Sequence, residues 1–261
     1  MQIRFLGHAA FSIEVNGLRL CVDPHRPGAL GGRFHLPAIV GPFDAVLTSH
    51  RHEDHAGWTP ALGTNRWIDR ATDLRGPGGQ VVVRTRPAFH DSVGGTRMGL
   101  VRMLSIAAAG RRVVHCGDIG AFDDDDVAWL AGADALLVPV GGTFTLDGAG
   151  AADLVRRVAP RCVVPMHARD PDVDLALDSI EPFVQALAAP VRRRDALDLP
   201  RDCRAGGPIV YLLNRPSSPP GAAAAVEAAA VPGPSGAVAK SSQPGSTGVQ
   251  GQTPDSDPRP R

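Results

Sequence analysis

The short segment from residue 49 to residue 55 holds the side chains best suited to chemistry. It reads Ser-His-Arg-His-Glu-Asp-His and follows the apolar stretch 45–48. A tight loop of this composition can offer His50 and His52 to one metal ion, and Asp54 and His55 to a neighbouring ion. Neutral imidazole and carboxylate together suit Zn²⁺, with Mn²⁺ or iron as alternatives. The alternative is a histidine-rich surface loop, but the ligands that a metal site would still lack occur further along the chain.

Three more residues of the right types follow later predicted strands. They are His90, Asp118 and His167, each at or near the end of an apolar, β-branched run. Together with the H-x-H-x-D-H segment, this order resembles the signature of the metallo-β-lactamase superfamily. The resemblance covers about residues 1 to 214 and includes a complete set of seven ligand positions.

Shorter segments resemble one branch of that superfamily, the group that contains ascorbate-6-phosphate lactonase and related metal-dependent hydrolases. These segments are Leu6-Gly7-His8-Ala9-Ala10-Phe11, Val22-Asp23-Pro24, residues 139–145 and Val164-Pro165-Met166-His167. One position departs from the pattern, because Thr143 stands where relatives often carry histidine. That departure bears on the substrate and leaves the metal ligands untouched.

The resemblance implies an α/β (α+β) fold, a four-layer αββα sandwich of two mixed β-sheets flanked by helices. It assigns His50, His52 and His90 to a first metal, Asp54, His55 and His167 to a second, and Asp118 to a bridge between them. It also suggests that His8 and Asp23 support ligands from behind, as carboxylates near ligating histidines do. The alternatives are a satisfied core histidine for His8 and an ordinary turn residue before Pro24 for Asp23.

The function implied by the resemblance is hydrolysis by two divalent metal ions, with Zn²⁺ expected and Mn²⁺ or iron as alternatives. A metal-bridging hydroxide would attack a lactone or ester carbonyl, or a phosphodiester, of a small molecule. Asp54, His55 and Asp118 form the expected catalytic set, in which either Asp54 or a metal-bound water protonates the leaving group. The chain has no G-x-S-x-G nucleophile motif. Two other functions remain open: an iron-dependent redox enzyme on the same fold, and a non-catalytic binding protein.

Composition limits the partners. The 27 basic and 27 acidic residues cancel, so the chain carries no overall charge that would attract nucleic acid. No apolar stretch approaches the roughly 20 residues that a membrane helix needs. We therefore expect a cytoplasmic protein with a small-molecule substrate and no nucleic-acid or membrane partner, and a homo-oligomer would fit the resemblance. The four cysteines are expected to be buried, reduced thiols.

The pattern along the chain predicts one domain, 1–214, followed by a disordered tail, 215–261, that is rich in Pro, Gly, Ala and Ser. An antiparallel meander over 2–23 with a turn at Asn16-Gly17 opens the domain. His25 and His35 fall in the loop 24–42, where solvent exposure is expected rather than contact with the substrate. Further strands are expected at 44–48, 66–69, 80–85, 100–106, 111–117, 134–139, 161–166 and 209–213, and helices at 123–131, 148–158 and 174–188.

Overall fold

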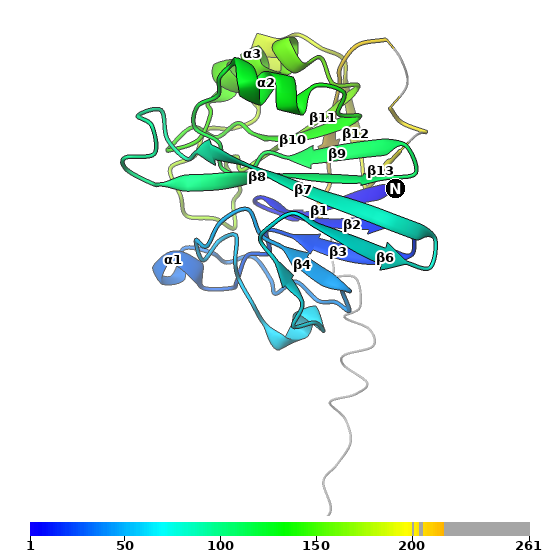
Figure 1. The fold of residues 1–261 in the computed structure, drawn as a ribbon. Coiled ribbons are helices and arrows are strands. Elements are labelled where there is room, and N and C mark those ends of the chain that lie inside the picture. The colour runs from blue at the N-terminus through cyan, green and yellow to red at the C-terminus, as the bar shows by residue number, and fades with distance from the viewer. Residues whose placement is uncertain (200, 204–205, 217–261) are drawn as a thin grey trace, which may run out of the picture.

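The computed structural model describes residues 1–199, 201–203 and 206–216. Two mixed β-sheets pack face to face, and helices α2 and α3 lie above the second sheet in Figure 1. The expected α/β sandwich of two mixed sheets with flanking helices is confirmed. The predicted tail lies outside the described residues, except for Arg215 and Pro216.

The first sheet has six strands in the order β13-β1-β2-β3-β4-β5. Its antiparallel meander turns at Asn16 and Gly17, whose φ values of 48° and 75° suit a two-residue hairpin turn. β4 and β5 then add in parallel to β3. The strands are β1 (Gln2–Gly7), β2 (Ala10–Val15), β3 (Leu18–Val22), β4 (Ala45–Leu47), β5 (Trp67–Ile68) and β13 (Leu197–Asp198).

The second sheet has eight strands in the order β12-β14-β11-β10-β9-β8-β7-β6. Neighbouring strands are parallel in the half of the sheet that runs from β9 through β10, β11 and β14 to β12. Neighbouring strands are antiparallel in the other half, from β6 to β9. The strands are β6 (Thr72–Gly76), β7 (Gly79–Phe89), β8 (Leu100–Ala108), β9 (Arg111–His115), β10 (Ala135–Pro139), β11 (Cys162–Met166), β12 (Val191–Arg194) and β14 (Ile209–Leu213). The sequence reading did not predict β6, β12 or β13.

Strand alternation divides the apolar side chains between two core layers. Leu137 and Val164 point into the layer between the sheets, where they join Ile13 and Leu20 of the first sheet. Their neighbours Leu136 and Val163 belong instead to the layer under the helices, which includes Leu154, Val155 and Phe183. The continuous apolar runs of these strands therefore reflect burial on both faces.

Two of the predicted helices form where expected, α2 (Asp124–Leu130) and α3 (Gly148–Val158). Asp123 caps α2 by accepting a hydrogen bond from the backbone N–H of Asp126. The prediction of a third helix over 174–188 is wrong for its first residues, because α4 begins only at Glu181 and ends at Leu187. Pro182 in the first turn marks where this helix begins. α1 (Ala29–Gly32) and the 3₁₀ turn η1 (Pro60–Leu62) are short, and no helix in the described ranges is long and apolar enough to cross a membrane.

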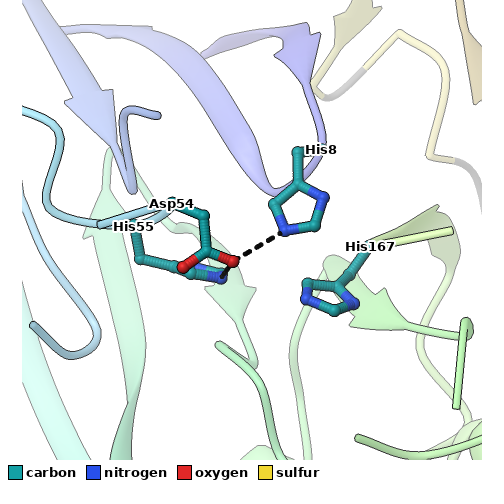
Figure 2. Close-up of side chains that lie close together, drawn as sticks. All are labelled: His8, Asp54, His55 and His167. Atoms are coloured by element: carbon teal, nitrogen blue, oxygen red, sulfur yellow. Dashed lines mark hydrogen bonds and ion pairs between the residues drawn. The ribbon is translucent and has the colours of Figure 1, made fainter. Parts of the chain in front are cut away.

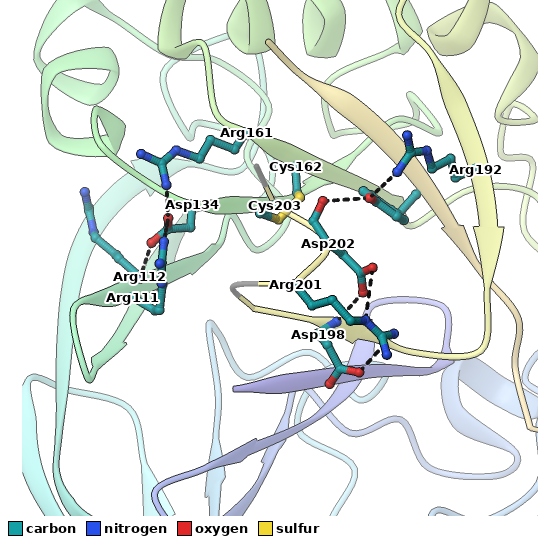
Figure 3. The surroundings of a disulfide bond; sticks show 11 residues. Arg111, Arg112, Asp134, Arg161, Cys162, Arg192, Asp198, Arg201, Asp202 and Cys203 are labelled. Atoms are coloured by element: carbon teal, nitrogen blue, oxygen red, sulfur yellow. Dashed lines mark hydrogen bonds and ion pairs between the residues drawn. A yellow bond between two sulfur atoms is a disulfide. The ribbon is translucent and has the colours of Figure 1, made fainter. Parts of the chain in front are cut away.

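The prediction that all four cysteines are reduced thiols is wrong for two of them. Cys162 and Cys203 form a disulfide, and Figure 3 shows it between β11 and the segment before β14. Their Cα atoms lie 5.6 Å apart although 41 positions separate them in sequence. This distance falls in the usual range for a disulfide, and only the folded topology creates it. Cys21 and Cys116 are free and buried, as predicted.

Candidate metal centre

All seven residues predicted to bind metal lie at one edge of the sandwich. His50 follows β4, His90 follows β7, and His167 follows β11 directly. Asp118 lies three residues beyond β9. The carboxyl ends of parallel strands meet at one edge of a sheet, which is where α/β proteins gather functional side chains. The remaining three, His52, Asp54 and His55, are held on the loop that His50 begins.

A first group consists of His50, His52 and His90, whose ring nitrogens are close enough to share one ion. His50 Nε2 and His52 Nδ1 are 2.9 Å apart, and His90 Nε2 is 3.2 Å from the same His52 nitrogen. Donors bound to one Zn²⁺ at roughly 2.1 Å are separated by about 3–4 Å. The group therefore has the spacing of a three-histidine site.

A second group consists of Asp54, His55, His167 and, in addition, His8. Figure 2 shows these four side chains converging from three separate segments. His55 Nε2 is 3.5 Å from Asp54 Oδ2, and His8 Nε2 is 3.2 Å from that same oxygen. All four are buried, so their polar atoms depend on one another or on a bound ion rather than on solvent.

Asp118 connects the two groups through a single oxygen. Its Oδ2 lies 3.0 Å from His55 Nε2 and 3.2 Å from His167 Nε2, both of the second group. The same oxygen lies 3.6 Å from His90 Nε2 and 3.9 Å from His50 Nε2, both of the first group. Asp118 is thus placed where the resemblance expects a bridging carboxylate.

The charges of this cluster fit divalent cations. Burial alone would lower the pKa of His55, but the carboxylates of Asp118 and Asp54 raise it well above its usual range. Burial also lowers the pKa of His50 to about 3, with His55 adding to the effect, so that imidazole is neutral and available as a ligand. Within the described part of the chain, Asp118 Oδ1 is buried without a hydrogen-bond partner. A metal site needs buried carboxylates that attract positive charge and ligand atoms that are not already used in hydrogen bonds.

Asp23 orients one histidine of each group. His55 Nδ1 donates to Asp23 Oδ2 at 2.9 Å. His50 Nδ1 donates to Ser49 Oγ at 2.9 Å, and that hydroxyl donates to Asp23 Oδ2 at 2.5 Å. Both histidines are thereby held with Nε2 toward the cluster. The expected supporting position of Asp23 agrees with this geometry, whereas the sequence reading overlooked Ser49, whose only sign is its place beside His50.

A strained turn orients His90. Its Nδ1 donates to the backbone carbonyl of Phe144 at 3.1 Å. Thr143 and Phe144 both have left-handed backbones, with φ values of 43° and 69°. Such conformations are costly for non-glycine residues and cluster at functional sites. The Thr143 hydroxyl secures the turn by donating to the carbonyl of Ala176. The sequence marked Thr143 only as a departure from relatives.

A cavity of about 450 Å³ opens onto the cluster. His52, Asp54, His90, Asp118 and His167 border it, so both groups face one space. The other lining residues are mainly apolar: Leu30, Arg33, Met98, Thr143, Phe144, Leu175, Ala176 and Leu177. The segment 174–180, which was expected to be helical, instead supplies one wall of this cavity. A separate cavity of about 590 Å³ touches His50 but borders no other expected ligand.

The structure contradicts one prediction for the loop 24–42. His25 is 1% exposed, so the predicted solvent exposure is wrong, whereas His35 is exposed. His25 Nε2 donates to the carbonyl of Pro37 at 3.1 Å, which ties the loop 24–42 together. Neither histidine lines the cavity. His115 is buried, and its Nε2 donates to the backbone carbonyl of Ala9 at 2.9 Å.

Comparisons with known proteins agree with this fold and this site. The model of the β-lactamase superfamily domain matches residues 2–167, so the chain belongs to the metallo-β-lactamase superfamily. A metal-dependent hydrolase of Carboxydothermus hydrogenoformans is 32% identical over 194 residues, 64% of this chain and 84% of that protein. One from Caldivirga maquilingensis is 29% identical over 235 residues, 76% of this chain and 98% of that protein.

A solved structure from Thermotoga maritima, described as a zinc-dependent hydrolase of this superfamily, has the same fold. Its TM-score is 0.62 at 24% identity, and the match covers 82% of this chain and 99% of that one. With these relatives, the chain lies in the branch of metal-dependent hydrolases, and the expectation of a metal-dependent enzyme is confirmed at that level.

Proposed function

We propose that the chain is a binuclear hydrolase that cleaves a lactone or ester carbonyl, or a phosphodiester, of a small molecule. The observation that carries this proposal is the position of Asp118. One of its oxygens lies within 3.9 Å of histidine nitrogens from both groups. A carboxylate in that position suits two neighbouring cations better than one.

Each group would hold one cation. The first position would take His50, His52 and His90, and the second would take Asp54, His55 and His167, with Asp118 shared. When bound, two divalent ions would activate a water molecule and polarise the bond to be cleaved. Zn²⁺ suits the first position, because three histidines would hold it and leave room for water, with Asp118 shared with the second cation.

Asp54 is the side chain placed to handle the proton. Burial alone would raise the pKa of Asp54, but His55, together with hydrogen bonds from His55 and His8, holds it well below its usual range. The carboxylate is therefore ionised, as a metal ligand must be, and its low pKa makes it a weak base. Because Asp54 also borders the cavity, it would take a proton from water and pass it to the leaving group.

The cavity supports a substrate with an apolar body and a negative charge. Leu30, Met98, Phe144 and Leu177 supply apolar walls. Among the residues that line this cavity, all in the described part of the chain, Arg33 carries the one permanent positive charge. Apolar walls favour a lactone or ester over a phosphodiester, and Arg33 would attract a carboxylate or phosphate elsewhere on the molecule.

Metal analysis of the purified protein tests the metal centre. We expect about two zinc or manganese ions per chain, and His52→Ala should lose metal and activity while it stays folded. His35→Ala is the matched control, since His35 is exposed and lies outside the cluster. Two ions in wild type and in the control, with fewer in His52→Ala, would support the proposal. Full metal content and activity in His52→Ala would overturn it.

A substrate panel tests the reaction. Lactones and aryl esters with and without a carboxylate, and matched phosphodiesters, should separate the two reaction classes. Iron-loaded, coloured protein without hydrolytic activity would instead indicate the redox alternative. Protein that binds no metal even after incubation with zinc would indicate a binding protein.

A further inference from the structure

His8 occupies an unusual place in the backbone. It follows β1 in the turn to β2, and its φ of 55° is left-handed. The backbone N–H of His167 donates to the carbonyl of His8 at 2.8 Å. His167 also has a left-handed φ, of 50°. Two strained residues from opposite sheets are thus joined at the second group, and strain of this kind is retained mainly where function requires it.

The imidazole of His8 points into the second group, as Figure 2 shows. Its Nε2 is 3.2 Å from Asp54 Oδ2. Its ring centroid lies 4.1 Å from that of His167 and 5.5 Å from that of His55. The four donor atoms all lie within 4.8 Å of one another. The side chain is 1% exposed, so solvent does not compete for this nitrogen.

We propose that His8 is a direct ligand of the second cation rather than a support for another ligand. This inference rests on the proposed binuclear function. The second position would then have five protein donors, His8, Asp54, His55, Asp118 and His167, whereas the first has four. Zn²⁺ in protein sites is commonly four-coordinate, whereas Mn²⁺ and other octahedral ions accept six ligands. The second position would therefore favour a six-coordinate ion such as Mn²⁺, which makes the two positions chemically different.

The far side of the His8 ring supports this assignment. Its Nδ1 has no hydrogen-bond partner among the described residues, and the same holds for Nδ1 of His167. Both histidines border one cavity of about 320 Å³ behind the cluster. Neither Nδ1 is held by a partner, so each ring can carry its proton on Nδ1 and present Nε2 to the second group. His8 and His167 are therefore alike at both ring nitrogens: Nδ1 has no partner, and Nε2 lies 3.2 Å from a carboxylate oxygen.

Cobalt(II) titration tests the coordination directly, because visible bands are strong for four-coordinate and weak for six-coordinate cobalt. The variant is His8→Asn, since asparagine tolerates a left-handed backbone and is too short to replace the imidazole. The matched control is His25→Asn, which removes another buried histidine outside the cluster. In wild type and in the control, the second equivalent of cobalt should add only weak bands. In His8→Asn it should add stronger bands and bind at least tenfold more weakly.

The outcomes separate this inference from the proposed function. Two bound cobalt ions with an unchanged second spectrum in His8→Asn would overturn the ligand role and leave the binuclear proposal intact. Fewer than two ions in wild type would overturn the binuclear proposal. If His8→Asn does not fold, His8→Gly with added imidazole replaces it, and imidazole should restore the wild-type spectrum. Strong tetrahedral bands from the second equivalent in wild type would overturn the inference without any variant.

Discussion

His55 donates from Nδ1 to the buried carboxylate of Asp23 at 2.9 Å, on the side facing away from the other ligands. The same carboxylate receives the Ser49 hydroxyl and, through it, holds His50. Asp23 therefore fixes one histidine in each half of the centre from a position that no substrate reaches. Its own φ of 45° is left-handed, which indicates that the chain accepts strain to put a carboxylate there.

We predict that Asp23→Asn weakens metal binding by about 10–100-fold, the usual effect of losing a partner behind the ligands. The neutral amide would stabilise neither histidine as well and would offer the Ser49 hydroxyl a weaker acceptor. Competition against a chelator measures the effect. Asp134→Asn is the matched control, because Asp134 is a buried carboxylate that bonds to Arg111 and Arg112 away from the site. Equal metal affinity in the two variants would contradict the assigned role.

We predict that Asp91→Ala loosens the loop that follows His90 without removing metal. The Asp91 carboxylate accepts four backbone N–H groups, from Val93, Gly95, Arg97 and Met98. Without that acceptor, Met98 would no longer be fixed at the cavity wall, and kcat/KM should fall by about tenfold or more. Faster amide exchange over 92–99 with unchanged metal content would show that the loop alone responds.

Asp73→Ala is the control for this loop experiment, since Asp73 is an exposed carboxylate paired with Arg84. The backbone bonds hold the pKa of Asp91 at about 2, although burial alone would raise it. Because the pKa of Asp91 is lower in the folded than in the unfolded protein, its ionised carboxylate stabilises the loop fully above the unfolded-state pKa. That stabilisation is lost as the pH falls through the folded-state pKa. Loop order should therefore persist down to about pH 3 and fail below it. Loss of loop order near pH 5 would contradict this account.

The candidate ligand residues could be grouped from the sequence because their positions are local or follow strands directly. Four of them, His50, His52, Asp54 and His55, fall within six consecutive positions, and His167 ends an apolar run. Strand periodicity put these residues at the ends of predicted strands, and the resemblance to the metallo-β-lactamase superfamily implied that they lie together. The two mixed sheets followed from the same resemblance and the same periodicity.

Features that depend on long-range packing were not predictable. The position of His8 inside the second group depends on how β1 packs against β11, and no local pattern encodes that distance. The Cys162–Cys203 disulfide likewise depends on topology, since neither cysteine belongs to a recognisable spacing motif. The segment 174–180 has helical spacing of its apolar residues, yet backbone bonds such as Asp178 N–H to Gly141 carbonyl fix it as a cavity wall. Tertiary contacts overrode local propensity there.

We predict that the native protein has two titratable thiols after unfolding without reductant, from Cys21 and Cys116. Cys203→Ser should lower the free energy of unfolding by about 2–4 kcal/mol, because it opens a loop of 41 residues in the unfolded chain. Reductant should lower the stability of wild type but not of Cys203→Ser. Four thiols in the unreduced protein would show that the disulfide does not form.

The last prediction concerns the pH dependence that His25 imposes on stability. Burial lowers the pKa of His25 from 6.5 to about 4, while the Pro37 carbonyl partly opposes that shift. Between these two values the unfolded chain binds the proton more readily than the folded chain does. Stability must therefore fall as pH decreases from about 6.5 to about 4. His25→Gln, which keeps a donor for Pro37 but does not titrate, should lose less stability than wild type over that range.

Thermal unfolding midpoints between pH 7 and pH 4.5 measure this difference, with wild type and variant in the same metal-containing buffers. Metal release at low pH affects both proteins alike, so the difference between their slopes isolates His25. His35→Gln is the control, because His35 is exposed and should leave the slope of wild type unchanged. Parallel slopes for wild type and His25→Gln would mean that the buried imidazole takes up its proton without unfolding. In that case the loop 24–42 would have to open locally at low pH, and amide exchange at Leu36 and Ala38, on either side of Pro37, would increase before the domain unfolds.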